Sequence, residues 1–398
     1  MLFNKADILI PKNCDLTKWS VVACDQYTSE PQYWQRVEKT VGDAPSTLKL
    51  VYPEAFLSQG EERIEKINAQ MNEYIREGLF KEYPQSLVYT ERTLPGGRVR
   101  RGIVGAVDLE EYDYTKGAKS AVRATEGTVL SRIPPRVKIR ENAPLELPHI
   151  LLLINDSGRT VIEDAKKGEK LYDFDLMENG GHLCGWHMSG ETADDFLKNF
   201  ESFSKNCADN LVIAVGDGNH SLATAKQCWE NLKKGLTAKE RENHPARYCL
   251  AELENIHDSV LMFEPIHRVV FNVSERDFTK KIKEALSLGE SGDEAYAIEI
   301  LSNGKSEKLY IHNAKSPLAV GEVQRFLDEN RCEVDYIHGT DVTARLAKES
   351  GTVGILLPKP DKNSLFETVI RDGALPRKTF SMGEANEKRF YMEAKRIN

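Results

Sequence analysis

The stretch NLVIAVGDGNHSLATAKQCW, from Asn210 to Trp229, joins an apolar segment, a glycine turn and a helical pattern. The apolar run from Leu211 to Val215 is typical of a buried strand. The turn GDGNHS, from Gly216 to Ser221, follows directly, and apolar residues then recur at the spacing of a helix that opens at Ser221. The sequence therefore predicts a strand, a tight turn and a helix in immediate succession.

The turn between this strand and this helix is a candidate anion site. The first N–H groups of a helix have no partner inside it and lie at the positive end of the helix dipole, which favours phosphate. Gly216 and Gly218 permit a ligand to approach the backbone closely. The structural alternative is that Asp217 and Ser221 only cap the helix. His220 favours the anion site, because a histidine at a helix start can donate to phosphate or carry a proton.

The turn lacks the features of two common nucleotide motifs. It matches only part of the dinucleotide-binding fingerprint, and no acidic residue ends a following strand. No lysine stands in the position that a P-loop requires. A serine nucleophile elbow and a recognisable Cys/His pair are also absent from the sequence, so covalent hydrolysis is not supported.

Composition indicates a globular protein of about two domains. The chain has 398 residues, of which 40% are hydrophobic and 29% charged. A net charge of −8 argues against a nucleic-acid partner. No apolar run approaches the roughly 20 residues that cross a bilayer, and the N-terminus has no signal-peptide pattern. Seven scattered cysteines without a Cys-x-x-Cys pair argue against a disulfide scaffold. We expect a cytoplasmic protein without a membrane partner.

Helical and strand-like segments alternate along the rest of the chain, which predicts a mixed α/β fold. Capping boxes at Ser29–Gln32 and Ser58–Glu61 predict two helices, which end near Val41 and Gly78. We expect one region over residues 1–255 and a C-terminal α/β region over 256–398. Further strands are predicted at 86–92, 98–107, 148–154, 260–263, 268–272, 296–301, 308–312, 333–337 and 353–357, and further helices at 277–287, 321–330 and 341–349.

Four segments resemble one known family in the family's own order. Gly216–Ser221 is similar to the Asp-Gly-His-His-Arg motif of domain-of-unknown-function family 1015, a bacterial and archaeal family. Arg123–Thr128 resembles its Arg/Lys-x-His-Glu-x-Thr segment, Glu264–Val270 its Pro-x-His-Arg segment, and Leu375–Phe380 its Met-Pro-x-Lys-Ser-Thr end. The chain is identified as a member of this family on a match that covers nearly its whole length.

The turn also resembles the Asp-Gly-x-His turn of the ParB-like group. That group includes sulfiredoxins and free-serine kinases, which bind nucleotide phosphates at this helix start. The resemblance implies a ParB-like phosphate-binding core with an additional C-terminal α/β region. Asn219 stands where a first histidine is usual and Ser221 where an arginine is usual, so a bidentate phosphate ligand is missing here.

Together these resemblances imply phosphoryl transfer between a nucleotide and a small hydroxylated metabolite such as free serine. The cofactor expected is Mg²⁺ with ATP or ADP, with Asp217 as the metal ligand. Asp217 alternatively orients His220, and Glu126 takes the proton of the hydroxyl group. The expected catalytic residues are Glu126, Asp217 and His220, and the expected phosphate- or substrate-binding residues are Arg123, Gly218, Asn219, Ser221, His267, Arg268 and Lys378.

The role of Glu126 has a simpler alternative. It is the single acid in the basic stretch from Lys119 to Arg140, so an ion pair with Arg123 or Arg132 would explain it. His182, Cys184 and His187 invite a zinc site, which we disfavour because strand alternation puts His187 on the other face.

Three functions from different classes are open at this point. A non-catalytic sensor of a nucleotide or phosphometabolite is the alternative to the enzyme. DNA binding by a ParB-like relative is disfavoured by the net charge of −8. A homodimer is among the assemblies that the sequence leaves open.

Overall fold

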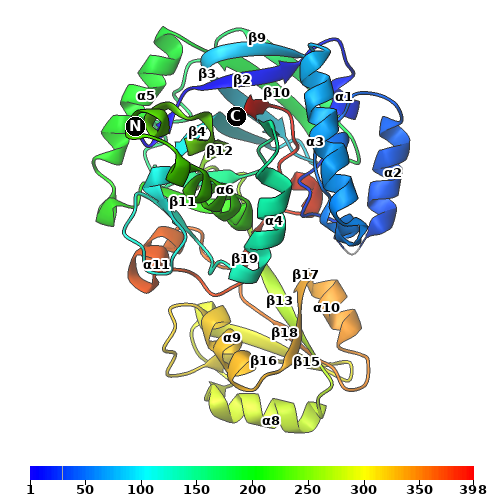
Figure 1. The fold of residues 1–398 in the computed structure, drawn as a ribbon. Helices are drawn as coiled ribbons and strands as arrows, with labels where there is room; N and C mark the ends of the chain where they lie inside the picture. Colours follow the sequence, from blue (N-terminus) through cyan, green and yellow to red (C-terminus); the bar gives the residue numbers. More distant parts are fainter. Residues whose placement is uncertain (29) are drawn as a thin grey trace. The chain divides into compact units, whose positions relative to one another are not determined.

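Mixed α/β structure, as the sequence predicts, is present in both units into which the chain divides (Figure 1). The computed structural model describes residues 1–28 and 30–398, so the predicted capping residue Ser29 lies outside the described residues. The first unit consists of Met1–Leu261 and Glu384–Asn398, and the second of Met262–Gly383. The predicted division at residue 255 stays a prediction.

The first unit is built around a mixed sheet whose central strands carry the glycine turn. β11 (Ile213–Asp217) runs parallel to β6 (Val122–Ala124) but antiparallel to β8 (Leu151–Ile154), and β8 runs parallel to β12 (Tyr248–Asn255). Off the main path of the sheet, β10 (Gly181–Met188) pairs with β3 (Phe80–Thr93) and with β9 (Lys170–Leu176). The order of the main path is β5 (Tyr112–Asp113), β6 (Val122–Ala124), β11 (Ile213–Asp217), β8 (Leu151–Ile154), β12 (Tyr248–Asn255), β4 (Val99–Asp108), β3 (Phe80–Thr93), β2 (Ala6–Pro11), β20 (Ala394–Arg396) and β7 (Leu145–Glu146), with β1 (Phe3–Asn4) beside β4.

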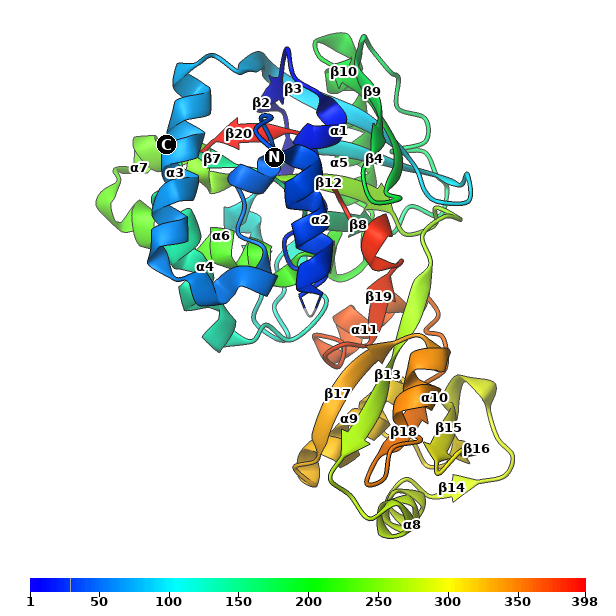
Figure 2. The ribbon, with the colours of Figure 1, turned by 90° about the vertical axis from the view of Figure 1, so that its right-hand side faces the viewer.

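The sheet separates two hydrophobic cores, because successive side chains of a strand point to opposite faces. On β3, Val88 packs into one core and Leu87 into the other, and on β12 Leu250 and Cys249 divide in the same way. Figures 1 and 2 show α2 (Pro31–Val41) and α3 (Glu61–Arg76) together on one side of this unit. The other helices of the unit are α1 (Leu16–Trp19), α4 (Ile133–Arg140), α5 (Glu191–Ser204), α6 (Asn219–Leu232) and α7 (Ala238–Asn243).

Helix α6 is anchored by the apolar side chains whose spacing predicts it. Leu222, Ala225 and Trp229 are buried, and Trp229 Nε1 donates to Glu110 Oε1 at 2.6 Å. Truncating a buried tryptophan to alanine costs about 3–5 kcal/mol. Helix α6 is therefore held firmly in the core of the first unit.

The last residues of the chain return to the first unit. Leu9 of β2 pairs with Ala394 of β20, which Figure 2 shows in red between β2 and β7. Before that strand, Tyr391 N–H donates to the Val21 carbonyl at 2.9 Å, and Val22 and Phe390 form an antiparallel bridge. This backbone pairing carries residues 388–391 to the segment that follows α1.

The second unit has its own sheet and its own core. Its strand order is β14 (Leu288–Gly289), β16 (Lys305–Ile311), β15 (Ala297–Ser302), β18 (Val353–Leu356), β13 (Phe263–Phe271) and β17 (Glu333–His338), with β19 (Phe380–Met382) beside β13. The predicted hairpin across residues 302–304 is confirmed as β15 and β16. The helices are α8 (Glu275–Ala285), α9 (Ala319–Glu329), α10 (Thr340–Leu346) and α11 (Ser364–Asp372).

Candidate functional site

The glycine turn joins β11 to α6 through a single left-handed residue. Gly218 has φ 79° and ψ 27°, and α6 begins at Asn219 rather than at the predicted Ser221. A Cβ at Gly218 would lie 3.1 Å from Ile150 Cα. Both the positive φ and this close approach to the residue before β8 require glycine. The helix starts earlier than predicted because one glycine suffices to reverse the chain.

The start of α6 has the geometry expected of an anion site. Its first internal hydrogen bond runs from Leu222 N–H to the Gly218 carbonyl at 3.0 Å, and no side chain caps the helix at Gly218. The N–H groups before Leu222 therefore lie outside the helical hydrogen-bond pattern, at the positive end of the dipole. An anion bound here stays a prediction.

Asp217 does not act as the N-cap of α6, which is the role that the structural alternative gives it. Its Oδ1 accepts from Gly218 N–H at 2.9 Å, and its Oδ2 lies 3.1 Å from Lys388 Nζ. The Lys388 side chain is 8% exposed and that of Asp217 22%. The carboxylate predicted to bind magnesium is thus paired with an ammonium group from the far end of the chain.

The predicted base, Glu126, lies in a loop that is tied to the helix start. Asn219 Oδ1 accepts from Thr125 N–H at 3.2 Å, and Thr125 Oγ1 donates to the Val215 carbonyl at 2.6 Å. Farther along, His220 Nε2 accepts from Val129 N–H at 3.3 Å. Residues 125 and 129 flank the half-buried Glu126 on either side. The loop of Glu126 and the side chain of His220 are therefore neighbours.

Arg123 is not directed at the glycine turn. Its Nη1 donates to Asp209 Oδ2 at 3.0 Å and its Nε to the Ser120 carbonyl at 2.8 Å. Ser120 precedes β6 and Asp209 precedes β11, and these two strands are parallel. The guanidinium group thus lies at the beginning of the strands, whereas the turn lies at their end. This placement favours a structural role for Arg123 over the predicted phosphate contact.

Ser221 belongs to a chain of buried hydrogen bonds that the sequence does not reveal. Its Oγ lies 2.9 Å from His149 Nε2, and His149 Nδ1 lies 2.9 Å from Tyr391 Oη. Tyr391 Oη in turn accepts from Cys24 N–H at 3.2 Å. Burial raises the pKa of the Cys24 thiol to about 12, so this cysteine is a neutral group and not a nucleophile. His149 is fixed at both ring nitrogens.

A second carboxylate, that of Asp25, interacts electrostatically with Lys388 and with His149. Burial would raise the pKa of Asp25, but His149, the hydrogen bond from Gln26 and Lys388 together hold it below its usual value. Lys388 therefore pairs with Asp217 and also favours the charged form of Asp25. Magnesium commonly uses one or two carboxylates together with substrate phosphates, and Asp217 and Asp25 are ligands of that chemical type.

Sequence reasoning missed four residues of this constellation. One local signal was present, a histidine within the otherwise apolar strand predicted at 148–154. The other three have no local signal, because only the pairing of Val22 with Phe390 brings their segments together. The four residues are Asp25, His149, Lys388 and Tyr391.

Three other predicted ligands lie in the second unit. Arg268 is completely buried, and its guanidinium group donates to Gln324 Oε1 at 3.2 Å and to the Lys378 carbonyl at 3.0 Å. His267 is 2% exposed and its Nδ1 accepts from Leu357 N–H at 3.1 Å. These contacts favour structural roles for Arg268 and His267. The side chain of Lys378 is exposed.

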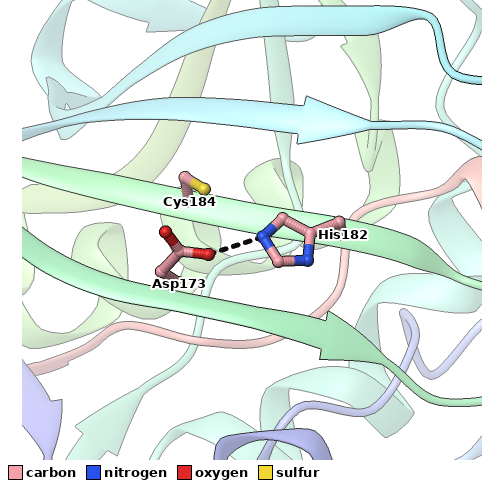
Figure 3. Close-up of side chains that lie close together, drawn as sticks. All are labelled: Asp173, His182 and Cys184. Carbon is pink, nitrogen blue, oxygen red and sulfur yellow. Dashed lines mark hydrogen bonds and ion pairs between the residues drawn. The ribbon is translucent and has the colours of Figure 1, made fainter.

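The hairpin of β9 and β10 holds the residues that invited a zinc site. Figure 3 shows His182, Cys184 and Asp173 side by side, with ligand atoms within 4.8 Å of one another. His187 lies elsewhere, 2.8 Å from Ser86 Oγ through its Nε2. Both nitrogens of His182 already contact carboxylates at 2.7 Å, those of Asp173 and Asp175. Ion pairing therefore explains the closeness of these side chains.

The chain matches the model of one family, described as "Protein of unknown function (DUF1015)", over residues 9–330. No curated protein matches the sequence.

Solved structures with a similar arrangement are distant. A free serine kinase mutant in complex with AMP has 12% identity and a TM-score of 0.40, with 75% of this chain and 92% of that chain covered. C-terminally truncated SbnI from Staphylococcus aureus has 11% identity and a TM-score of 0.39, with 73% and 82% covered. A conserved hypothetical protein from Pyrococcus furiosus has 12% identity and a TM-score of 0.35, with 73% and 90% covered. At these scores the ParB-like core stays a prediction.

Among the helices of the described residues, none has the length and apolar character that a membrane span requires.

Proposed function

The chain belongs to the DUF1015 family of proteins of unknown function, and from its glycine turn we propose that it transfers a phosphoryl group between a nucleotide and a small hydroxylated metabolite such as free serine. The observation that carries the proposal is the uncapped start of α6 beside Lys388 and two carboxylates. Phosphoryl transfer needs positioning and charge neutralisation more than covalent chemistry, and these groups supply both.

Each group has a role in this proposal. The N–H groups of Asn219, His220 and Ser221 hold the phosphates, and Lys388 offsets their charge. Asp217, with Asp25, would hold Mg²⁺ bound to ATP or ADP, and the ion would neutralise the transferring group. Glu126 accepts the proton of the attacking hydroxyl group.

A product assay tests the transfer. The protein is incubated with serine and Mg²⁺, together with ATP, ADP or pyrophosphate, and O-phosphoserine is sought by phosphorus NMR. Wild type should form it. Glu126→Gln should lose at least ~100-fold in rate with unchanged nucleotide affinity, since a general base contributes about 10²–10⁴. Glu191→Gln, at an exposed position on α5, is the matched control and should behave as wild type. Equal rates in all three proteins would remove Glu126 from the reaction.

A nucleotide or phosphometabolite sensor is the second candidate, and one observation favours it. Asn219 and Ser221, which stand where the resembled motif has histidine and arginine, are both engaged within the protein, with Thr125 and His149. The helix start therefore adds no cationic side chain of its own at these two positions. Tight nucleotide binding without any turned-over product would establish the sensor over the enzyme.

A further inference from the structure

A cavity of about 180 Å³ lies beside the start of α6, within the first unit. Ser221 and Thr224 line it from α6, and His149 and Tyr391 line it from the hydrogen-bonded chain that ends at Ser221. The rest of its wall is mainly apolar and includes Ile139 of α4 and Ala143. The cavity thus has one polar edge, at the helix start, and an apolar interior.

The ionic side chains of the wall are paired with one another. Arg136 contacts Glu54, and Arg140 contacts Glu146, which also lies 3.2 Å from Lys395 Nζ. A charged ligand group would gain no partner from these pairs and would pay the cost of leaving water. The interior therefore suits a neutral, flat or aliphatic group.

The size of the cavity matches that of a small ring system. An apolar cavity of about 150 Å³ holds a benzene molecule, and the present one is somewhat larger at about 180 Å³. Free serine is too small and too polar to fill it. A heteroaromatic base matches the cavity in size and in charge. At the edge, the hydroxyl oxygens of Ser221 and Thr224 can accept a hydrogen bond from the base, while Thr224 Oγ1 itself donates to the His220 carbonyl at 2.7 Å.

We propose that this cavity binds the nucleobase of a nucleotide whose phosphates lie at the start of α6. The inference rests on the proposed function and names the part of the substrate that the cavity takes. Ser221 belongs to both places, since its N–H precedes the first internal bond of the helix and its side chain lines the cavity. A nucleoside monophosphate carries its base and its anion within one small molecule, as this shared residue requires.

Equilibrium binding of three probes tests the inference: AMP, ribose 5-phosphate and inorganic phosphate. AMP should bind wild type at least ~10-fold more tightly than ribose 5-phosphate, because only AMP buries an aromatic base. Ala143→Leu, which adds three carbon atoms at a wall residue that is 6% exposed, should abolish this preference and leave the affinity for ribose 5-phosphate unchanged. Ala238→Leu, at an exposed position of α7, should keep the preference.

Each contrary outcome has one meaning. Equal affinities of wild type for AMP and ribose 5-phosphate would overturn the nucleobase assignment while the phosphate site stands. A hexyl phosphate that binds as tightly as AMP, with the same loss in Ala143→Leu, would overturn it in favour of an aliphatic ligand. If none of the three probes binds wild type, the proposed function fails, and the inference fails with it. The retained affinity for ribose 5-phosphate also verifies that Ala143→Leu is folded.

Discussion

Lys388 Nζ lies 3.1 Å from Asp217 Oδ2, an ion pair that joins the C-terminal segment to the residue before the glycine turn. Because the lysine is 8% exposed, this pair is screened by water much less than a surface pair. It places a positive charge beside the start of α6, where the helix dipole already favours an anion. The relationship makes Lys388 both a stabilising group and a candidate phosphate ligand.

Replacement of Lys388 by alanine should therefore lower both stability and phosphate affinity. We expect a loss of about 1–3 kcal/mol, less than the about 3–5 of a fully buried pair because Asp217 keeps some contact with water. Urea unfolding followed by tryptophan fluorescence measures it in the first unit, which holds all 4 tryptophans. The matched control is Lys166→Ala, which removes an exposed pair with Asp195 in the same unit and should cost at most about 1 kcal/mol. Equal small losses in both variants would contradict a buried role for Lys388.

The hydroxyl group of Tyr391 should contribute more to the free energy of unfolding than the hydroxyl group of an exposed tyrosine. Tyr391→Phe leaves the Cys24 N–H and His149 Nδ1 without their partner in a buried place, at a cost of about 1–3 kcal/mol. Tyr248 donates to the Glu242 carbonyl at 2.9 Å in a solvent-exposed bond, so Tyr248→Phe should cost less than about 0.5 kcal/mol. The same fluorescence measurement compares the two. A Tyr391→Phe protein as stable as Tyr248→Phe would show that His149 is held without this bond.

The sequence predicts those parts of the site whose signal is local. β11 and the start of α6 follow from an apolar run, two glycines and a helical period within the 20 residues first quoted. The β3–β4 hairpin is confirmed for the same reason, since its turn stands between two alternating segments. Helix α4 was not predicted, although its prolines, Pro134 and Pro135, stand in the first turn of a helix, where proline is well tolerated.

The cations and carboxylates around the turn could not be predicted in this way. Lys388 and Asp25 reach Asp217 and His149 only through the bridge between Val22 and Phe390, and backbone pairing of this kind leaves no spacing in the sequence. The predicted phosphate contact of Arg123 comes from the resemblance of Arg123–Thr128 to a family segment. In the structure the guanidinium group of Arg123 pairs with Asp209, a contact that the local segment does not reveal.

The second unit should lose stability in mild acid because of His267. Burial, helped by Arg268 and His338, lowers the pKa of His267 to about 4. The unfolded chain binds a proton below its ordinary pKa of about 6.5, whereas the folded chain stays neutral until about pH 4. Stability is therefore full above about pH 6.5 and falls as the pH drops toward 4, by at most about 3 kcal/mol.

Urea unfolding at several pH values checks this dependence. Circular dichroism follows the unfolding of both units, whereas tryptophan fluorescence follows only the first, because all 4 tryptophans lie there. An unfolding transition seen by circular dichroism alone is therefore that of the second unit. In His267→Gln, the free energy of unfolding of the second unit should decrease less between pH 6.5 and 4 than in wild type. His312→Gln, at an exposed histidine of the same unit, should retain it. An unchanged slope in His267→Gln would refute the assignment.

Asp217 offers the sharpest test of the metal. Asp217→Asn keeps the hydrogen bond from Gly218 N–H but removes the charge that faces Lys388, so some stability will be lost whether or not magnesium binds. Lys388→Met isolates that loss, and the double variant completes a cycle in which the ion pair itself cancels.

If Asp217 is a ligand of Mg²⁺, Asp217→Asn should weaken ATP binding by ~10-fold or more in the presence of Mg²⁺ and hardly at all in its absence. The same magnesium-specific loss should persist on the Lys388→Met background, because it does not come from the ion pair. Titrations of ATP with and without Mg²⁺ on the four proteins measure it. Identical effects of Asp217→Asn in both conditions would leave Asp217 as the partner of Lys388 and remove the metal ligand from the proposed reaction.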